Sequence, residues 1–180
     1  MAEILLGVTG GAAAFKACAL ASLLRKAGHG VNAVATSAAM EFVSAVQLSA
    51  VTGRPCYTKL FDEDRGEFIP HIALTDKADL MVVAPATANF MGKAACGLAD
   101  DLLSAAFLAC SAPVVFAPAM NTRMWNNPAV SHNVKVLAQR GVIMAGPVSG
   151  TLACGTAGSG RMMEPEDVFR ICSDVLDRRK

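Results

Sequence analysis

The sequence predicts one α/β domain over residues 1–180, a doubly wound parallel sheet of the Rossmann or flavodoxin type in a three-layer sandwich. Short apolar runs alternate with longer helical segments along the whole chain. The runs are rich in Val, Ile and Leu without polar alternation, which is typical of parallel strands covered by helices on both faces. Gly, Pro, Ser or Thr separates the runs from the helices, as turns require.

Five apolar runs are predicted as strands, in the order 3–9, 31–35, 79–84, 114–117 and 142–144. Each run is too short for a typical helix and ends near a turn-forming residue. The segments between and after them are predicted as helices, at 12–26, 37–51, 87–95, 101–109, 128–139 and 164–178. Gly28-His29-Gly30 ends the first helix and Gly53-Arg54-Pro55 ends the second.

Two segments are predicted to be irregular. Residues 62–67 are mostly charged and are expected to form a solvated loop. Segment 146–162 contains four glycines between positions 150 and 160, which predicts a flexible loop. A loop of this length is long enough to serve as a lid over a substrate.

The composition limits the class of protein. Hydrophobic residues make up 53% and charged residues 17%, which indicates surface buried against other subunits. The net charge of +1 provides no electrostatic case for nucleic acid. No apolar run approaches the roughly 18 residues of a membrane helix. The first residues lack a basic segment and a cleavage site, so a cytoplasmic location is expected.

Small or hydroxyl-bearing residues follow the first three strands. These are Thr9-Gly10-Gly11, Thr36-Ser37 and Thr87-Ala88-Asn89-Phe90. Because the carboxyl ends of parallel strands meet at one edge of a sheet, these three segments and the segment after the fourth strand are expected to converge on one crevice.

The first of these turns favours a phosphate, since small residues allow close approach and a helix start offers free N–H groups. It lacks the full Gly-x-Gly-x-x-Gly spacing, and hydroxyls stand where an NAD site has an acid. A mononucleotide phosphate or ribityl chain fits better. A tight turn without a ligand remains an alternative. Phe42 either packs on a flat ring or belongs to the core.

The segment after the fourth strand carries the amide of Asn121, the thioethers of Met120 and Met124, and the only Trp of the chain. An amide offers both donors and an acceptor, so Asn121 can hold a carboxylate. The alternative is that Asn121 caps a helix.

Two further residues are candidates for proton transfer. His71 can act as a base near neutral pH, or it can be structural at the start of a helix. Cys154 lies in the glycine-rich segment and, as a thiol, can donate a proton.

These motifs resemble the homo-oligomeric flavin-containing cysteine decarboxylases. Pro118-Ala119-Met120-Asn121-Thr122-Arg123-Met124-Trp125 matches the family's Pro-x-Met-Asn-x-x-Met-Trp signature. Pro85-Ala86-Thr87-Ala88-Asn89 is similar to its Pro-Ala-Ser-Ala-Asn-Thr motif, and His71 stands where the family has its active-site histidine. Ala153-Cys154-Gly155-x-x-Gly-x-Gly160-Arg161-Met162 resembles the lid of the phosphopantothenoylcysteine decarboxylase branch. The turn Thr9-Gly10-Gly11-Ala12 differs conservatively from the Ser-Gly-Gly/Ser-Ile-Ala of relatives.

The resemblance implies FMN as cofactor and no metal. The expected FMN contacts are Thr9, Gly10, Gly11, Thr36, Ser37, Phe42, Thr87, Ala88, Asn89, Phe90 and Ala119. The expected substrate contacts are Asn121, Met124, Ala153, Arg161 and Met162. The implied roles are His71 as base, Asn121 as holder of the substrate carboxylate and Cys154 as proton donor.

The implied reaction is oxidative decarboxylation of 4'-phosphopantothenoylcysteine to 4'-phosphopantetheine. Oxidation by the flavin creates a thioaldehyde that lets the carboxylate leave as CO2, and the enethiol is then reduced and protonated. The alternatives are a peptidyl-cysteine decarboxylase, a flavoprotein subunit of dipicolinate synthase, or a non-catalytic flavin-binding regulator.

The resemblance also implies a homo-oligomer built from trimers, with the active site at a subunit boundary. Bacterial relatives usually continue into a synthetase domain, so such a domain or subunit is an expected partner. The chain is then either a free-standing decarboxylase or the decarboxylase part of a longer protein.

Overall fold

The computed structural model describes residues 1–61, 69–151, 155 and 157–178. Within this part the main sheet has the strand order β2-β1-β3-β4-β5, and every neighbouring pair is parallel. The strands are β1 (Glu3–Val8), β2 (Gly30–Ala35), β3 (Leu80–Ala86), β4 (Val114–Pro118) and β5 (Ile143–Met144). This is the order of flavodoxin-like folds, and the predicted doubly wound α/β fold is confirmed.

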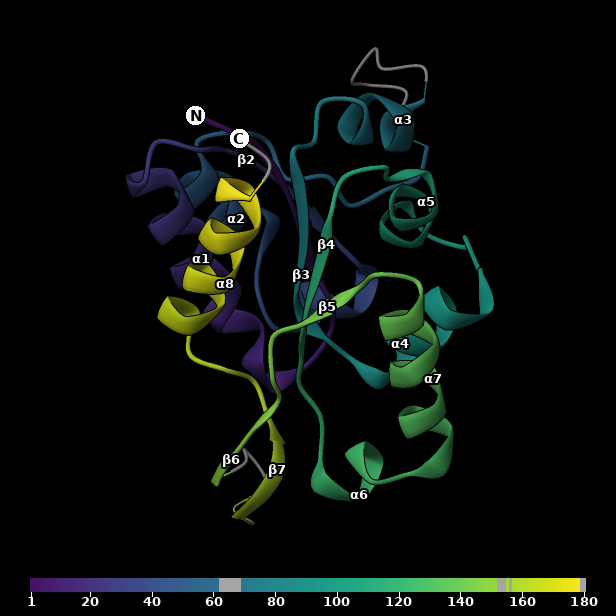
Figure 1. Ribbon diagram of the computed structural model, residues 1–180. Coiled ribbons are helices and arrows are strands. Elements are labelled where there is room, and N and C mark those ends of the chain that lie inside the picture. Colours follow the sequence, from purple (N-terminus) through teal and green to yellow (C-terminus); the bar gives the residue numbers. More distant parts are fainter. Residues whose placement is uncertain (62–68, 152–154, 156, 179–180) are drawn as a thin grey trace.

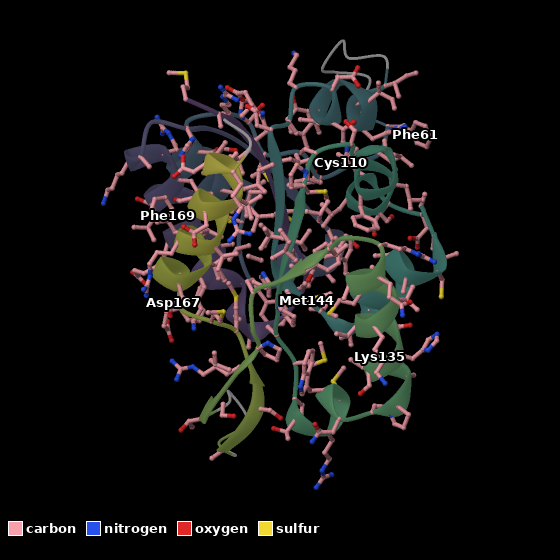
Figure 2. The ribbon with its side chains drawn as sticks, viewed as in Figure 1. Phe61, Cys110, Lys135, Met144, Asp167 and Phe169 are labelled. Carbon is pink, nitrogen blue, oxygen red and sulfur yellow. The ribbon has the colours of Figure 1, made fainter. Side chains whose placement is uncertain are left out.

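Helices cover both faces of the sheet and complete three layers (Figure 1). On one face lie α1 (Phe15–Lys26), α2 (Ala45–Thr52) and α8 (Pro165–Asp177). On the other lie α3 (Pro70–Thr75), α4 (Ala88–Cys96), α5 (Leu102–Ala109) and α7 (Pro128–Gln139). Figure 2 shows the side chains that fill these layers, with Phe169 on the α8 side and Met144 and Cys110 on the other.

The burial of the strands explains why their sequences are apolar throughout. All residues of β3 and β4 are buried, as are five of the six residues of β1. A strand buried on both faces needs no polar alternation, so the apolar runs of the sequence report these strands directly. None of the helices in the described ranges has the length and apolar character needed to cross a membrane.

The predicted helix over 37–51 is interrupted. A 3-10 helix, η2, covers Ser37–Glu41, and α2 begins anew at Ala45. The reason is Ser44, which has extended backbone geometry and whose side chain accepts a hydrogen bond from the backbone N–H of Gln47. Such a cap starts a helix and ends the helical path before it. Phe42 falls in the interruption and is 54% exposed, so it does not belong to the core.

The segment predicted as a long glycine-rich loop contains regular structure. β6 (Val148–Thr151) and β7 (Ala157–Arg161) pair as antiparallel strands, which we call the β6–β7 hairpin. The hairpin projects beyond the sheet at the end where the strands finish, next to α6 (Thr122–Trp125) (Figure 1). The residues between the two strands, except Gly155, lie outside the described ranges, as do residues 62–67.

Candidate functional site

A crevice of about 830 Å³ lies at the carboxyl ends of the strands. The loops after β1, β2, β3 and β4 and the β6–β7 hairpin all contribute to its walls. The residues predicted from the sequence that line it are Thr9, Gly10, Gly11, Thr36, Ser37, Thr87, Ala88, Asn89, Phe90, Ala119, Asn121, Met124, Arg161 and Met162. The predicted convergence of the strand ends on one crevice is therefore confirmed.

The loop after β1 forms an open helix start. Gly11 is the N-cap of the 3-10 helix η1 (Ala12–Ala14), and no side chain caps it. The N-cap of α1 has no side-chain cap either. At Gly10 a Cβ atom would come within 2.5 Å of the carbonyl oxygen of Ala38, so only glycine fits there. Backbone N–H groups at an uncapped helix start suit an anion such as a phosphate.

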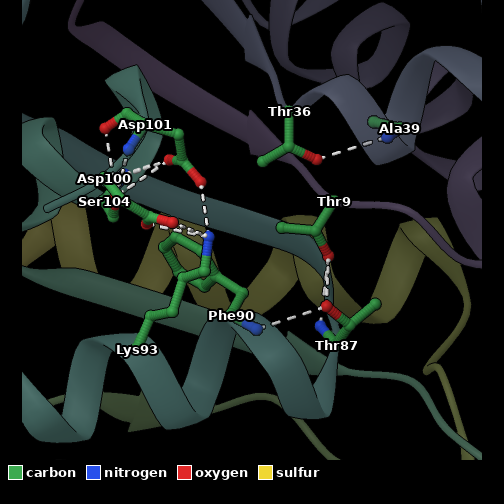
Figure 3. A network of polar contacts seen from close by, with 9 residues as sticks. All are labelled: Thr9, Thr36, Ala39, Thr87, Phe90, Lys93, Asp100, Asp101 and Ser104. Carbon is green, nitrogen blue, oxygen red and sulfur yellow. Dashed lines mark hydrogen bonds and ion pairs between the residues drawn. The ribbon is translucent and has the colours of Figure 1, made fainter. Parts of the chain in front are cut away.

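Thr9 joins the ends of β1 and β3 (Figure 3). Its hydroxyl donates to the carbonyl oxygen of Pro85 at 2.7 Å and accepts from the backbone N–H of Thr87 at 3.1 Å. The residue is only 2% exposed. Thr9 therefore shapes the crevice floor, and its hydroxyl hydrogen is committed to the protein.

Thr36 and Thr87 both cap helix starts at the crevice (Figure 3). Thr36 Oγ1 accepts from the backbone N–H of Ala39 at 3.2 Å, and Thr87 Oγ1 accepts from that of Phe90 at 3.5 Å. The capping hydroxyl of Thr36 accepts through its oxygen, so its hydrogen remains able to donate to a ligand, whereas the Thr87 hydroxyl also contacts the Thr9 hydroxyl at 3.1 Å. The Thr36 hydroxyl therefore suits a ribityl or phosphate oxygen of a mononucleotide.

Asn121 caps a helix and also lies at the crevice. It is the N-cap of α6, where its Oδ1 accepts from the backbone N–H of Arg123 at 2.8 Å, and it also lines the crevice. The cap fixes the side-chain orientation at the mouth of the crevice. Met124 follows one turn later, lines the crevice and is 48% exposed.

The β6–β7 hairpin is bonded to the segment that carries Asn121. The backbone N–H of Met120 donates to the carbonyl oxygen of Gly160 at 2.9 Å, and Thr122 Oγ1 donates to that of Ser159 at 2.7 Å. Gly160 has a φ of +117°, and a Cβ there would lie 2.3 Å from the carbonyl oxygen of Met120. Glycine at this position allows the strand to close on the crevice wall.

Two charged clusters border the crevice. In one, Lys93 Nζ contacts carboxylate oxygens of Asp100 at 2.8 Å and of Asp101 at 3.1 Å (Figure 3). The hydrogen bond to Asp100 is the main reason that the pKa of Lys93 is raised. Asp101 also caps α5 in a capping box with Ser104. Lys93 and Asp101 are therefore held rigidly at the wall.

The second cluster, which we call the foot cluster, consists of Lys16, Arg161 and Glu164 at the base of the hairpin. Lys16 Nζ lies 3.0 Å from Glu164 Oε2 and donates to the carbonyl oxygen of Met162 at 3.2 Å. Arg161 pairs with the other oxygen of Glu164. The hydrogen bond from Lys16 is the main reason that the pKa of Glu164 is lowered.

Some predicted site residues are not brought to this crevice. Phe42 and His71 do not line it. His71 lies on α3, which precedes β3 and sits at the opposite end of the sheet (Figure 1). Ala153 and Cys154 lie outside the described residues. Three lining residues with charged side chains were not predicted, namely Lys16, Lys93 and Asp101. A lysine within the apolar helix that follows the glycine turn was the available signal for Lys16.

The chain belongs to the flavoprotein family, whose model matches residues 1–176. Within that family it groups with the phosphopantothenoylcysteine (PPC) decarboxylase branch. It is similar to a PPC decarboxylase mutant solved with pantothenoylaminoethenethiol, with 30% identity, a TM-score of 0.87 and 98% of each chain covered. It is also similar to the FMN-dependent cysteine decarboxylase SpaF, with 33% identity, a TM-score of 0.80 and 97% and 98% of the two chains covered.

Among curated proteins, the chain is 47% identical to the coenzyme A biosynthesis bifunctional protein CoaBC of Bacillus subtilis, over 94% of this chain and 42% of that protein. It is 42% identical to the CoaBC protein of Mycobacterium tuberculosis, over 98% of this chain and 42% of that protein. The chain thus spans about two fifths of the length of these relatives. The resemblance expected from the motifs is confirmed.

Proposed function

We propose that this chain catalyses the FMN-dependent decarboxylation of 4'-phosphopantothenoylcysteine to 4'-phosphopantetheine in coenzyme A biosynthesis. The observation that carries the proposal is the crevice, where an uncapped helix start meets Asn121 and the β6–β7 hairpin. Relatives of the CoaBC type and the solved PPC decarboxylase support this substrate.

The residues of the crevice fit FMN. The open N–H groups at Gly11 and the close approach at Gly10 suit its phosphate, and the hydroxyl of Thr36 suits its ribityl chain. The volume of about 830 Å³ falls within the range of ligand sites. When bound, FMN supplies the two-electron oxidation and reduction that the reaction requires.

The protein residues then orient the substrate and move protons. Asn121 holds the carboxylate of the cysteine moiety, because its amide donates without adding a negative charge. His71 removes a proton during the oxidation, and Cys154 supplies a proton to the enethiol. Met124, Met162 and Arg161 contact the rest of the substrate from the crevice walls, and Ala153, which lies outside the described residues, is a further proposed contact.

The active site is proposed to lie between subunits of a homo-oligomer built from trimers. His71 is at the far end of the sheet from the crevice of its own chain, so it can serve only a neighbouring crevice. Phe15 and Met124, which line the crevice, are 63% and 48% exposed, and an apolar rim of this kind suits coverage by a second subunit.

A synthetase domain or subunit is the proposed partner, because the CoaBC relatives are named as bifunctional proteins. The cytoplasmic location expected from the sequence stays a prediction.

One other activity has specific support. SpaF, an FMN-dependent cysteine decarboxylase, is 33% identical to this chain, so a peptide that ends in cysteine is the second candidate substrate. The lid motif around Cys154 favours the pantothenoyl substrate.

The test is an absorption spectrum of the purified protein, followed by CO2 release with each substrate. We expect FMN to be released on denaturation and CO2 to form only with 4'-phosphopantothenoylcysteine. Turnover of the peptide alone would select the second candidate. Bound FMN without any turnover would instead identify a flavin-binding regulator.

The role of Cys154 has its own test. A serine hydroxyl is a much weaker acid than a thiol, so Cys154→Ser is expected to release CO2 but to stall before the final protonation. Mass spectrometry should then detect a product two hydrogens lighter than 4'-phosphopantetheine. Formation of the saturated thiol at the wild-type rate would exclude Cys154 as the proton donor.

A further inference from the structure

The foot cluster places two cations in the crevice wall. Lys16 is 8% exposed, and its ammonium is fixed by the carbonyl oxygen of Met162 and by Glu164. Arg161 lines the same crevice and pairs with Glu164 from the hairpin side. The two cations come from α1 and from the end of β7, which are far apart in the sequence and are joined by one carboxylate.

The side chain of Arg161 has a defined path. A Cβ at Gly150 would lie 3.0 Å from both Cδ and Nη1 of Arg161, so the side chain crosses β6 over this glycine. Glu164 holds the other edge of the guanidinium. Arginine has five N–H donors in a planar fork, and among the described residues one carboxylate oxygen of Glu164 engages only part of them. The remaining donors suit a second anion.

The charge balance also favours an anion. The charged residues that line the crevice, among those described, are Lys16, Lys93, Arg161 and Asp101. Lys93 is matched by Asp100 and Asp101. At the foot cluster, by contrast, two cations share the single carboxylate of Glu164. The foot cluster therefore retains a positive charge at the crevice wall.

We propose that Lys16 and Arg161, held in place by Glu164, form a subsite for the phosphate monoester of the substrate. This inference rests on the proposed function, and it identifies the groups that distinguish a phosphorylated from an unphosphorylated pantothenoyl arm. A planar guanidinium binds phosphate through two parallel hydrogen bonds, and a buried ammonium adds charge. FMN carries the same chemical group, but the uncapped helix start at Gly11 already provides for its phosphate.

The hairpin explains how both ends of the substrate are held. The hydrogen bond from Met120 to Gly160 places Arg161 and Asn121 on adjacent segments of one wall. Asn121 takes the carboxylate and the foot cluster takes the phosphate.

The experiment compares kcat/KM for 4'-phosphopantothenoylcysteine and for pantothenoylcysteine in the holoenzyme. In Arg161→Gln we expect kcat/KM for the phosphorylated substrate to fall by about 10- to 100-fold, mainly through KM, because charge-assisted hydrogen bonds to the phosphate are lost. The loss for the unphosphorylated substrate should be much smaller, because that substrate lacks the phosphate that Arg161 would bind. Arg161→Lys retains the charge without the fork and should show a smaller loss.

Arg170→Gln is the matched control, since Arg170 forms the same kind of pair with Asp167 on α8, away from the crevice. FMN affinity, measured by flavin fluorescence, should be equal in all variants. An equal loss with both substrates, or no loss with either, would overturn the subsite. Weaker FMN binding in Arg161→Gln would assign these cations to the cofactor phosphate instead. If the wild-type protein turns over neither substrate, the proposed function itself fails.

Discussion

Asn121 shows how a helix cap can also hold a side chain at the candidate site. As N-cap of α6 it accepts a backbone hydrogen bond from Arg123, and this bond holds its side chain at the crevice wall. The sequence presented capping and substrate binding as alternatives, whereas the structure makes the cap the device that orients the amide. A substitution that preserves the cap but changes the charge therefore isolates the proposed chemical role.

Asn121→Asp is such a substitution, because aspartate caps helices as well as asparagine does. We expect folding and FMN content to be retained, while decarboxylation falls by at least about 100-fold, since a carboxylate repels the substrate carboxylate at hydrogen-bond range. Turnover assays and the flavin spectrum check this. Activity within a few-fold of wild type would remove Asn121 from the site.

At the scale of elements, the β6–β7 hairpin is the least predictable part of the chain and the one that completes the crevice. Its strands are short, with β6 mostly exposed and β7 mostly half-buried, so it depends on docking to the α6 segment. The contacts at Met120 and Thr122 require a strand without a side chain at Gly160. Gly160 is therefore needed for the close approach of the two segments as much as for backbone flexibility.

Gly160→Ala should therefore undock the hairpin. The substitution meets the carbonyl oxygen of Met120 and also strains a positive φ. We expect KM for the substrate to rise by about tenfold or more, equivalent to roughly 1.4 kcal/mol of lost docking. Gly141→Ala is the matched control, since its φ of +89° imposes similar strain but no atom lies within 4 Å of its Cβ. Equal KM values in the two variants would contradict the docking role.

At the scale of the whole molecule, a cluster of polar and charged side chains lies at the amino-terminal end of the sheet, far from the crevice. Arg54 Nη2 donates to Glu3 Oε1 at 3.0 Å, and Asn32 donates to the same carboxylate. The hydrogen bond from Arg54 is the main reason that the pKa of Glu3 lies below its ordinary value. This ion pair joins β1 to the chain that follows α2.

A carboxylate whose pKa is lower in the folded than in the unfolded protein stabilises the fold at pH values above its unfolded pKa. That stabilisation is lost as the pH falls through the folded pKa. Between pH 7 and pH 3, wild type should lose up to about 1 kcal/mol more unfolding free energy than Glu3→Gln, because the pair is partly exposed. Urea unfolding at several pH values measures this difference. Glu41→Gln, at an exposed site with no ion pair to a described residue, should follow wild type. Parallel pH curves for wild type and Glu3→Gln would refute the prediction.

The oligomer that we propose has a direct test by subunit complementation. His71→Asn and Asn121→Asp should each be inactive alone. Refolded together in equal amounts, they should recover about a quarter of wild-type activity, since random assembly places an intact His71 beside an intact Asn121 at one boundary in four. Light scattering should show a mass above that of the monomer. If mixing restores no activity, His71 and Asn121 do not meet across a subunit boundary.

The sequence by itself determined the fold class and the identity of most crevice walls. Strands buried on both faces must be apolar throughout, and turns at their carboxyl ends must carry small or hydroxyl-bearing residues, so both features are readable from local composition. The loops at Thr9, Thr36 and Thr87 were found in this way, and the structure places all three at the crevice. The motif around Asn121 gave the family before any geometry was known.

Only the tertiary structure decided how distant residues combine. The bond between Met120 and Gly160, the ion pair between Lys16 and Glu164, and the distance of His71 from its own crevice all depend on packing between elements far apart in the chain. The periodicity of side chains reports which face of an element is buried and carries no information about which partner covers it. For that reason the foot cluster and the hairpin that it supports could not be predicted from the pattern of residues alone.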